Sequence, residues 1–350
     1  MAFHAGASRI PPTRDAGREH RADPGFGLGP GAEFDLIRGF LRGAADPRGD
    51  VRVGPGDDCA VVAGDGIALS TDMSVEGVHF RRDWLAPDEI GWRAAAAALS
   101  DLAAVAARPI GILVSLAAPP EDAGAFAAEV MAGCRAAAAS VGAALLGGDL
   151  TASPGPLVID VTVVGECPRP VLRSGARPGH EVWVTGELGA PAACIAALRG
   201  GRAPHPAARE RFARPRPRVA EALWLAERGL AASLLDLSDG LAGDAAHLSA
   251  ASGAAILLSP EIIPVHPALH PLPPDDALRL ALSGGEDYEL CFTAEVGLVE
   301  RHAAEFERTF HLRLSPVGRV GGGDGVWFVD VEGHRRPTGL RGWRHFEEGA

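Results

Sequence analysis

The sequence predicts an α/β or α+β fold with two domains, and three observations support this. The chain has 350 residues, a length typical of two domains. Short strand-type apolar segments alternate with longer helix-type segments in both halves, which is typical of sheets covered by helices. A segment at 167–179 contains three prolines and two glycines. This segment interrupts the alternation, and we place the domain boundary there, between residues 167 and 168.

The first half of the chain starts with a segment that has no periodicity. Residues 1–30 are rich in Gly, Pro, Arg and Ala, so we expect a flexible tail that adds nothing to the fold. Apolar residues spaced from 34 to 41 then predict a helix. A proline at 87 and an Arg-Pro pair at 108–109 delimit a long Ala-rich helix. The other elements expected in this half are a helix at 121–141 and strands at 60–62, 67–71, 110–116, 143–146 and 157–165.

The second half repeats the alternation. Its predicted strands are short apolar runs, and its predicted helices are longer segments delimited by glycine or proline. Three glycines at 321–323 predict a hairpin turn. The predicted strands are 182–185, 232–235, 255–258, 289–292 and 326–329, and the predicted helices are 189–198, 217–228, 241–251, 278–282 and 296–310.

Charge and composition exclude several classes of partner. The formal net charge is −12, so the protein repels polyanions, which argues against nucleic acid and against an anionic membrane. The chain contains no lysine, so it has no Gly-Lys-Ser/Thr unit of a P-loop. If ATP is used, its charge must be met by metal ions, arginine and backbone N–H groups.

Cysteine usage and apolar segments favour the cytoplasm. The five cysteines are scattered and form no Cys-x-x-Cys pair, so we expect buried free thiols in a reducing compartment. The N-terminus lacks the basic and apolar regions of a signal peptide. The most apolar long stretch, 93–108, is too short and too weakly hydrophobic to span a bilayer.

Acidic residues recur beside glycine-rich turns and at the ends of predicted strands. Any one of them could be a turn residue or a helix cap, as Asp239 before Gly240 could be. If they converge, they repel one another unless cations lie between them, and Mg²⁺ binds carboxylates together with phosphate oxygens and water. The set therefore predicts phosphate chemistry with several Mg²⁺ ions. It comprises Asp57, Asp58, Asp72, Asp101, Asp149, Asp236, Asp239, Glu286 and Asp287.

These acids lie in short motifs in a fixed order. The motifs are Gly54-Pro55-Gly56-Asp57-Asp58, Ser70-Thr71-Asp72, Val75-Glu76-Gly77-Val78-His79-Phe80, Leu99-Ser100-Asp101, Gly147-Gly148-Asp149, Arg173-Ser174-Gly175, Asp236-Leu237-Ser238-Asp239, Gly284-Gly285-Glu286-Asp287-Tyr288-Glu289-Leu290 and Gly342-Trp343-Arg344-His345-Phe346. In this order, over residues 31–346, the chain resembles the thiamine-monophosphate kinase family, within the aminoimidazole ribonucleotide synthetase superfamily. A single Gly-Gly-Asp is unspecific, whereas the ordered set is specific.

The resemblance implies a fold, an assembly and an activity. It implies two α/β domains with mixed sheets and helices packed on them, and a homodimer formed by the N-terminal domains. Residues 31–167 would bind ATP and Mg²⁺ and form the dimer. Residues 168–350 would add metal, ATP and substrate contacts. The activity implied is transfer of the ATP γ-phosphoryl group to thiamine monophosphate, without a general base, because the acceptor phosphate is already ionised near neutral pH.

The resemblance also implies roles for individual residues. The metal ligands would be Asp58, Ser70, Thr71, Asp72, Asp101, Asp149, Asp236 and Asp239. ATP would be contacted by Gly148, Asp149, Arg173 and Ser238, and thiamine monophosphate by His79, Glu286 and Trp343. A position on the predicted helix 121–141 that is often aromatic in the family is Met131 here, which leaves that nucleotide contact open.

The residues alone leave other roles open for single side chains and other functions open for the chain. Arg173 could be an exposed loop residue, His79 a buried core histidine and Trp343 a packing residue. The chain could be another enzyme of the superfamily, such as aminoimidazole ribonucleotide synthetase or a hydrogenase-maturation enzyme. Selenophosphate synthetase is disfavoured, because the chain has no lysine and no cysteine before Cys59. A non-catalytic nucleotide sensor would have lost one or more of the metal carboxylates.

Overall fold

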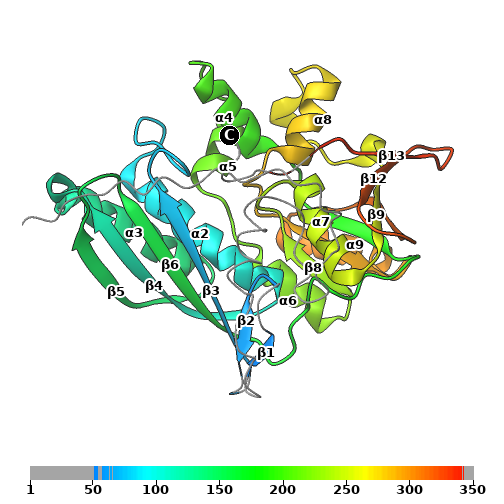
Figure 1. The fold of residues 1–350 in the computed structure, drawn as a ribbon, viewed down its shortest axis with the longest axis horizontal. Coiled ribbons are helices and arrows are strands. Elements are labelled where there is room, and N and C mark those ends of the chain that lie inside the picture. The colour runs from blue at the N-terminus through cyan, green and yellow to red at the C-terminus, as the bar shows by residue number, and fades with distance from the viewer. Residues whose placement is uncertain (1–50, 54–56, 63, 65, 341, 343–350) are drawn as a thin grey trace, which may run out of the picture.

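The computed structural model describes residues 51–53, 57–62, 64, 66–340 and 342. The tail predicted for 1–30 and the helix predicted near 34–41 lie outside the described residues. Two mixed sheets lie side by side, each with helices packed against it, and the long helix α2 (Pro87–Ala104) runs between them (Figure 1). The predicted class, mixed sheets with helices packed on them, is confirmed.

The N-terminal sheet has six strands. In spatial order they are β1 (Val51–Val53), β2 (Ala60–Val62), β3 (Ile67–Val75), β6 (Val158–Glu166), β4 (Arg108–Ala118) and β5 (Ala144–Ala152). Only β4 and β5 are parallel; the other neighbours are antiparallel. The short 3₁₀ helix η1 (Pro120–Asp122) leads toward α3 (Ala125–Ser140).

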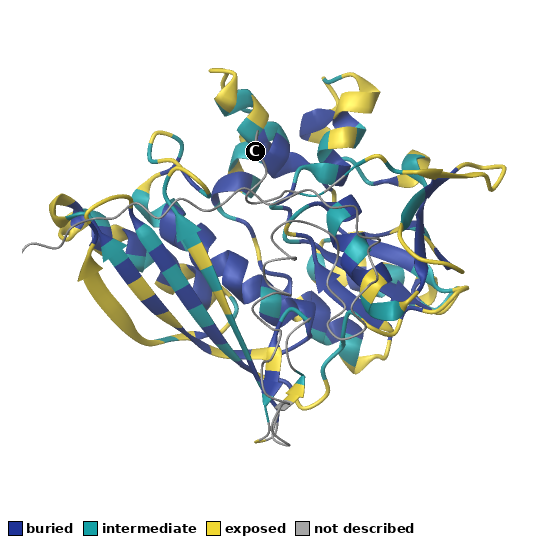
Figure 2. Cartoon of the chain, in the orientation of Figure 1, coloured by how far each residue is buried: buried dark blue, intermediate teal, exposed yellow. Residues whose placement is uncertain are grey.

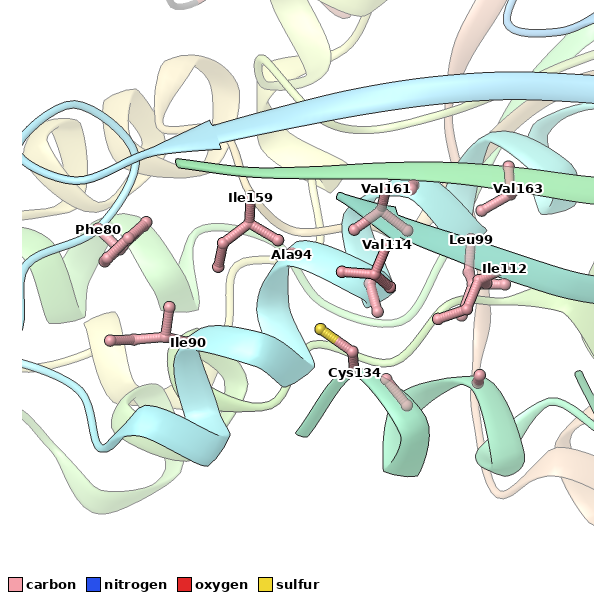
Figure 3. Close-up of a cluster of buried hydrophobic side chains, with 14 of the residues drawn as sticks. Phe80, Ile90, Ala94, Leu99, Ile112, Val114, Cys134, Ile159, Val161 and Val163 are labelled. Carbon is pink, nitrogen blue, oxygen red and sulfur yellow. The ribbon is translucent and has the colours of Figure 1, made fainter. Parts of the chain in front are cut away.

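Helices α2 and α3 cover one face of this sheet. Inward-pointing residues of β6 such as Ile159, Val161 and Val163 are fully buried against α2 and α3 (Figure 3), as the period of two along a strand requires. The two helices approach closely at Gly91, where an added Cβ would lie 1.8 Å from the Val130 carbonyl oxygen. This contact fixes α2, which carries several site residues.

The opposite face of the same sheet has no helix over it among the described residues. Strand β5 is exposed along most of its length, and half-buried residues alternate with buried ones on β6 (Figure 2). The outward side chains include large apolar groups, which monomeric proteins seldom leave in one exposed patch. They are Met73, Ile110, Leu113, Leu146 and Leu150, each at least 39% exposed.

The C-terminal sheet has seven strands. Their order is β13 (Arg335–Pro337), β12 (Val326–Val329), β9 (Ala255–Leu258), β11 (Leu314–Gly321), β7 (Glu181–Thr185), β10 (Leu290–Ala294) and β8 (Ser233–Asp236). The helices of this half are α4 (Ala190–Arg199), α5 (Pro206–Ala213), α6 (Val219–Glu227), α7 (Leu241–Ser252), α8 (Pro274–Ser283) and α9 (Glu300–Phe310), with short 3₁₀ helices η2 (Pro260–Ile262) and η3 (Pro267–Leu269).

The main differences from the predicted elements lie in this half. The hairpin predicted at 321–323 is wrong, because β9 lies between β11 and β12 and pairs with both. Helix α5 and strand β11 were not predicted. The six-stranded sheet ends at Glu166 and the seven-stranded sheet begins at Glu181; the domain division between 167 and 168 stays a prediction. No helix in the described part of the chain is long and apolar enough to cross a membrane.

Candidate active site

Three carboxylates from distant parts of the chain meet between the two sheets. Asp58 precedes β2, Asp101 lies on α2, and Asp236 ends β8. One oxygen atom of each lies within 4.8 Å of the others. The prediction that acids at element ends converge therefore holds for these three residues.

Hydroxyl groups and one guanidinium orient these acids. Ser70 Oγ donates to Asp101 Oδ2 over 2.5 Å, and Ser100 Oγ donates to Asp236 Oδ2 over 2.6 Å. Arg173 binds Asp58 through two parallel hydrogen bonds of 2.6 and 2.7 Å, the geometry that favours arginine over lysine. Arg173 is therefore a largely buried partner of the acids, with 15% of its side chain exposed, and not an exposed loop residue.

Burial and mutual repulsion raise the pKa values of these acids. Burial, followed by the charge of Asp58, raises the pKa of Asp236 to about 7. Burial, followed by the charges of Asp236, Asp72 and Asp58, raises the pKa of Asp101 well above its usual range. Burial also raises the pKa of Asp72 to about 6. Such shifts mark carboxylates that lack enough positive charge nearby.

The donor set suits a hard divalent cation. The converging atoms are carboxylate oxygens with serine hydroxyls beside them, and such ligands favour Mg²⁺ over zinc or copper. A second group adjoins the first: one atom each of Asp239, Asp244 and His247 lie within 4.8 Å of one another. The Asp239 backbone N–H donates to Asp244 Oδ2 over 3.1 Å.

A cavity of about 710 Å³ opens beside the acids. Asp72, Asp101, Asp236 and Asp239 line one part of it; we call this part the acid end. The other part, which we call the apolar end, is lined mainly by Phe80, Trp84, Ile90, Ala192, Ile195, Ala196, Phe212 and Leu280. Three arginines, Arg81, Arg93 and Arg199, also line the cavity. One cavity therefore joins a cluster of acids to a largely apolar region.

Two closely packed loops, one at Ser238 and one at Gly285, line the cavity. Gly285 has φ +69°, and an added Cβ would lie 2.7 Å from the Ser238 carbonyl oxygen, so glycine is needed there. The next residue, Glu286, also has a positive φ of 63°, and its N–H donates to the same oxygen over 2.7 Å. Left-handed backbone at a non-glycine residue is strained and often marks a functional site.

Of the remaining predicted site residues, some line the cavity and others do not. Ser238 and His79 line the cavity, and His79 Nδ1 accepts a 3.0 Å hydrogen bond from the Val75 N–H. The Thr71 hydroxyl lies 3.0 Å from Asp160 Oδ1 and 3.2 Å from the Thr162 hydroxyl, on the other side of β3 from Ser70. Trp343 lies outside the described residues. Met131 is partly buried and packs against the N-terminal core.

Gly148 and Asp149 do not reach the acids within one chain. Asp72 pairs with Val161 on β6, Val161 pairs with Val114 on β4, and Val114 pairs with Gly148 on β5. Since neighbouring strands lie about 4.8 Å apart, three steps separate Asp149 from Asp72 by on the order of 14 Å. Asp149 is exposed on β5.

The sequence did not predict a role for four residues that lie at the site. They are Ser100, Asp244, His247 and Phe212. Ser100 was part of a quoted motif, and its place one residue before Asp101 is the only sequence signal. Asp244 and His247 lie three residues apart after Asp239, a spacing that places both on one side of a helix. Phe212 had no signal, because its helix was not predicted.

Known proteins resemble this chain over most of its length. Residues 56–167 match the family model described as AIR synthase related protein, N-terminal domain. A thiamine-monophosphate kinase of Mycobacterium tuberculosis is 36% identical over 334 residues, which cover 90% of this chain and 92% of the relative. The chain belongs to the thiamine-monophosphate kinase family. The Escherichia coli K12 thiamine-monophosphate kinase is 38% identical over 273 residues, covering 75% of this chain and 82% of the relative.

A solved structure of a family relative agrees with this assignment. The structure described as AaThiL complexed with AMPPCP and TMP has a TM-score of 0.77 and 31% identity, and covers 90% of this chain and 97% of that one. The family resemblance inferred from the ordered motifs is confirmed. Membership in the thiamine-monophosphate kinase family also decides against the other superfamily enzymes considered from the sequence.

Proposed function

We propose that this chain transfers the γ-phosphoryl group of ATP to thiamine monophosphate, with Mg²⁺, to give thiamine diphosphate and ADP. The observation that carries the proposal is a cavity in which converging acids adjoin an apolar region. The relative that binds AMPPCP and TMP at 31% identity supports it. Two negatively charged substrates could meet beside these acids only if cations were bound there.

Residues of both sheets would hold the metal. Bound Mg²⁺ supplies charge neutralisation and orients phosphate oxygens. Ser70 and Ser100 fix the rotamers of Asp101 and Asp236 in advance. The Thr71 hydroxyl is engaged on the opposite face, so Thr71 would contribute its backbone carbonyl. The proposed ligands within one chain are Asp58, Ser70, Thr71, Asp72, Asp101, Asp236 and Asp239.

The chain's own groups position the reactants and take up no proton. The acceptor is a phosphate monoester that is ionised near neutral pH, so no general base is required. The remaining task is to hold donor and acceptor phosphates in line and close together. The rigid placement of the acids by α2, β3 and β8 suits this task.

The nucleotide contacts would be made in a homodimer. Ser238 and Arg173 lie at the acid end, whereas Gly148 and Asp149 are on exposed β5, away from the acids of their own chain. We propose that the apolar outer face of the N-terminal sheet pairs with a second copy, so that Asp149 and Gly148 serve the partner's site.

The organic part of thiamine monophosphate would occupy the apolar end. His79 and Glu286 line the same cavity, and Trp343 would complete the set of substrate contacts. The thiazolium ring is cationic, so the face of an aromatic side chain suits it. The five cysteines are buried and unbridged, which supports the cytoplasm as the location.

The proposal is tested by incubating the purified protein with ATP, Mg²⁺ and thiamine monophosphate and separating the products. We expect equimolar thiamine diphosphate and ADP, abolished by a chelator. ATP consumption without thiamine diphosphate would refute the proposed activity.

The dimer is tested by complementation. Asp149→Asn and Asp236→Asn homodimers should each be inactive. Mixing them under conditions that exchange subunits should restore activity, because one site of each heterodimer then has both acids. If the mixture stays inactive although subunits exchange, Asp149 does not act across the interface.

A further inference from the structure

An ion pair between a buried arginine and a half-buried glutamate joins the two halves of the chain at the wall of the cavity. Arg93 on α2 is 7% exposed, and its Nη2 lies 2.7 Å from Glu286 Oε1. Its Nη1 donates to the Phe212 backbone carbonyl, and its guanidinium lies 4.2 Å from the centre of the Phe212 ring. Arg93 is therefore held in one orientation by two segments that lie far from it in the sequence.

Glu286 is also held in one orientation, but one of its two carboxylate oxygens has no hydrogen-bond partner among the described residues. Its backbone is fixed by the bond to Ser238 and by the positive φ, and Oε1 is taken by Arg93. The second oxygen, Oε2, is buried and has no hydrogen-bond partner among the described residues. A buried carboxylate oxygen without a donor is costly. Because Glu286 lines the cavity, a ligand group that enters the cavity and reaches Oε2 with an N–H would remove this cost.

We propose that Arg93 is a positioning residue for the heterocycle of the substrate. Arg93 holds Glu286 so that Oε2 accepts a hydrogen bond from the exocyclic amino group of the aminopyrimidine ring. The inference rests on the proposed function, since it takes thiamine monophosphate as the ligand. The aliphatic and aromatic residues of the apolar end surround the ring, and the pair of Arg93 and Glu286 recognises its amino group.

Charge explains why an arginine is needed there. The charge of Glu286 contributes to the raised pKa of Asp72, so Glu286 and the acids of the acid end repel one another. The guanidinium compensates the Glu286 carboxylate locally and binds only its first oxygen, which leaves the second without a donor among the described residues. Without Arg93, Glu286 would lose both its counter-charge and its fixed direction.

The test compares Arg93→Met and Arg93→Lys with wild type in steady-state assays at saturating ATP and Mg²⁺. Loss of one charge-assisted hydrogen bond predicts a KM for thiamine monophosphate raised about 10- to 100-fold in Arg93→Met. The kcat should change less, and Arg93→Lys should recover part of the loss. The matched control is Trp92→Phe, because Trp92 Nε1 donates to the Pro215 carbonyl over 2.8 Å and so makes a similar contact between distant segments outside the cavity. This control should lower thermal stability without raising KM.

A substrate analogue separates recognition from simple stabilisation. In the 4-oxo analogue of thiamine monophosphate, a carbonyl oxygen replaces the amino group that would donate to Oε2. Wild type should discriminate strongly against it, whereas Arg93→Met and Glu286→Gln should discriminate little. Equal weakening of both substrates in Arg93→Met would overturn the inference, since Arg93 would then only hold the fold together.

The failure of this inference is distinguishable from failure of the proposed function. If wild type makes no thiamine diphosphate, the proposed activity fails, and calorimetric binding of thiamine monophosphate and its 4-oxo analogue still tests Arg93. If wild type is active and folded Arg93→Met or Arg93→Lys keeps the wild-type KM and discrimination, the role of Arg93 is refuted. Should Arg93→Met not fold, Arg93→Lys provides the measurement.

Discussion

The two ends of the cavity are stabilised in opposite ways. At the acid end, one guanidinium, that of Arg173, faces Asp57, Asp58 and Asp236, and burial raises the pKa of Asp57 to about 6. At the apolar end, Arg93 and Glu286 compensate each other within a hydrophobic wall. The acid end therefore needs added positive charge, whereas the apolar end is complete without it. We therefore expect bound metal to determine activity at the acid end, and the shape of the wall to determine which substrate binds at the apolar end.

The largest expected effect comes from removing one buried acid. Asp101→Asn keeps the size of the side chain and its contact with Ser70, but removes a proposed metal ligand and a charge that repels Asp236. We expect turnover to fall about 100- to 1000-fold, the scale of losing one preorganised electrostatic contact. The metal-free variant should also unfold at a higher temperature than wild type. Wild-type turnover, or a large loss of stability, would contradict the assignment.

The next largest expected effect is a dependence of stability on pH, which should come from the acid end and not from the apolar end. Burial raises the folded pKa of Asp72 to about 6 and of Asp236 to about 7 from a usual value of 3.8. The stability that these protonated acids contribute is fully present below pH 3.8 and is lost as pH rises through 6 to 7. Added Mg²⁺ binds the ionised acids, so its stabilising effect should grow from pH 5 to pH 8.

Thermal unfolding with and without Mg²⁺ measures this difference. Arg93→Lys serves as the control, because it leaves the acid end intact and should keep the same pH trend. A Mg²⁺ effect that is equal at pH 5 and pH 8 would mean that the acids are not the ions' ligands.

The smallest expected effect concerns the shape of the apolar end. Ala196 on α4 lines the cavity and is exposed, so Ala196→Trp should fold normally and narrow the space for the heterocycle. We expect the KM for thiamine monophosphate to rise about tenfold, within the range for steric discrimination in a pocket, with the KM for ATP unchanged. Parallel changes in both constants would show that the two ends are not independent.

The acid end of the cavity could be predicted from the sequence better than the apolar end. The acid end was predictable because its residues lie in compact motifs at strand ends and turns, where charge alone suggests a metal. The position of Asp149 was not, since only the strand order shows that β5 lies three strands from β3.

The apolar end could not be predicted from local patterns. Helix α5 follows a segment rich in glycine, proline and arginine that is typical of a loop, so Phe212 had no assigned place. Arg93 lies inside an Ala-rich helix, and its partners Phe212 and Glu286 are 119 and 193 residues away. The hairpin expected at 321–323 failed for a related reason: a strand from elsewhere in the chain, β9, inserts between the two strands.

The most direct test of the central claim is to count the metal ions. Mn²⁺ can replace Mg²⁺ at oxygen-ligand sites, and electron paramagnetic resonance detects coupling between neighbouring Mn²⁺ ions. With a non-hydrolysable ATP analogue, we predict more than one coupled Mn²⁺ per site in wild type and loss of that coupling in Asp101→Asn. A single uncoupled ion in both proteins, as the nucleotide alone would carry, would contradict the claim that these acids gather cations to bring two phosphates together.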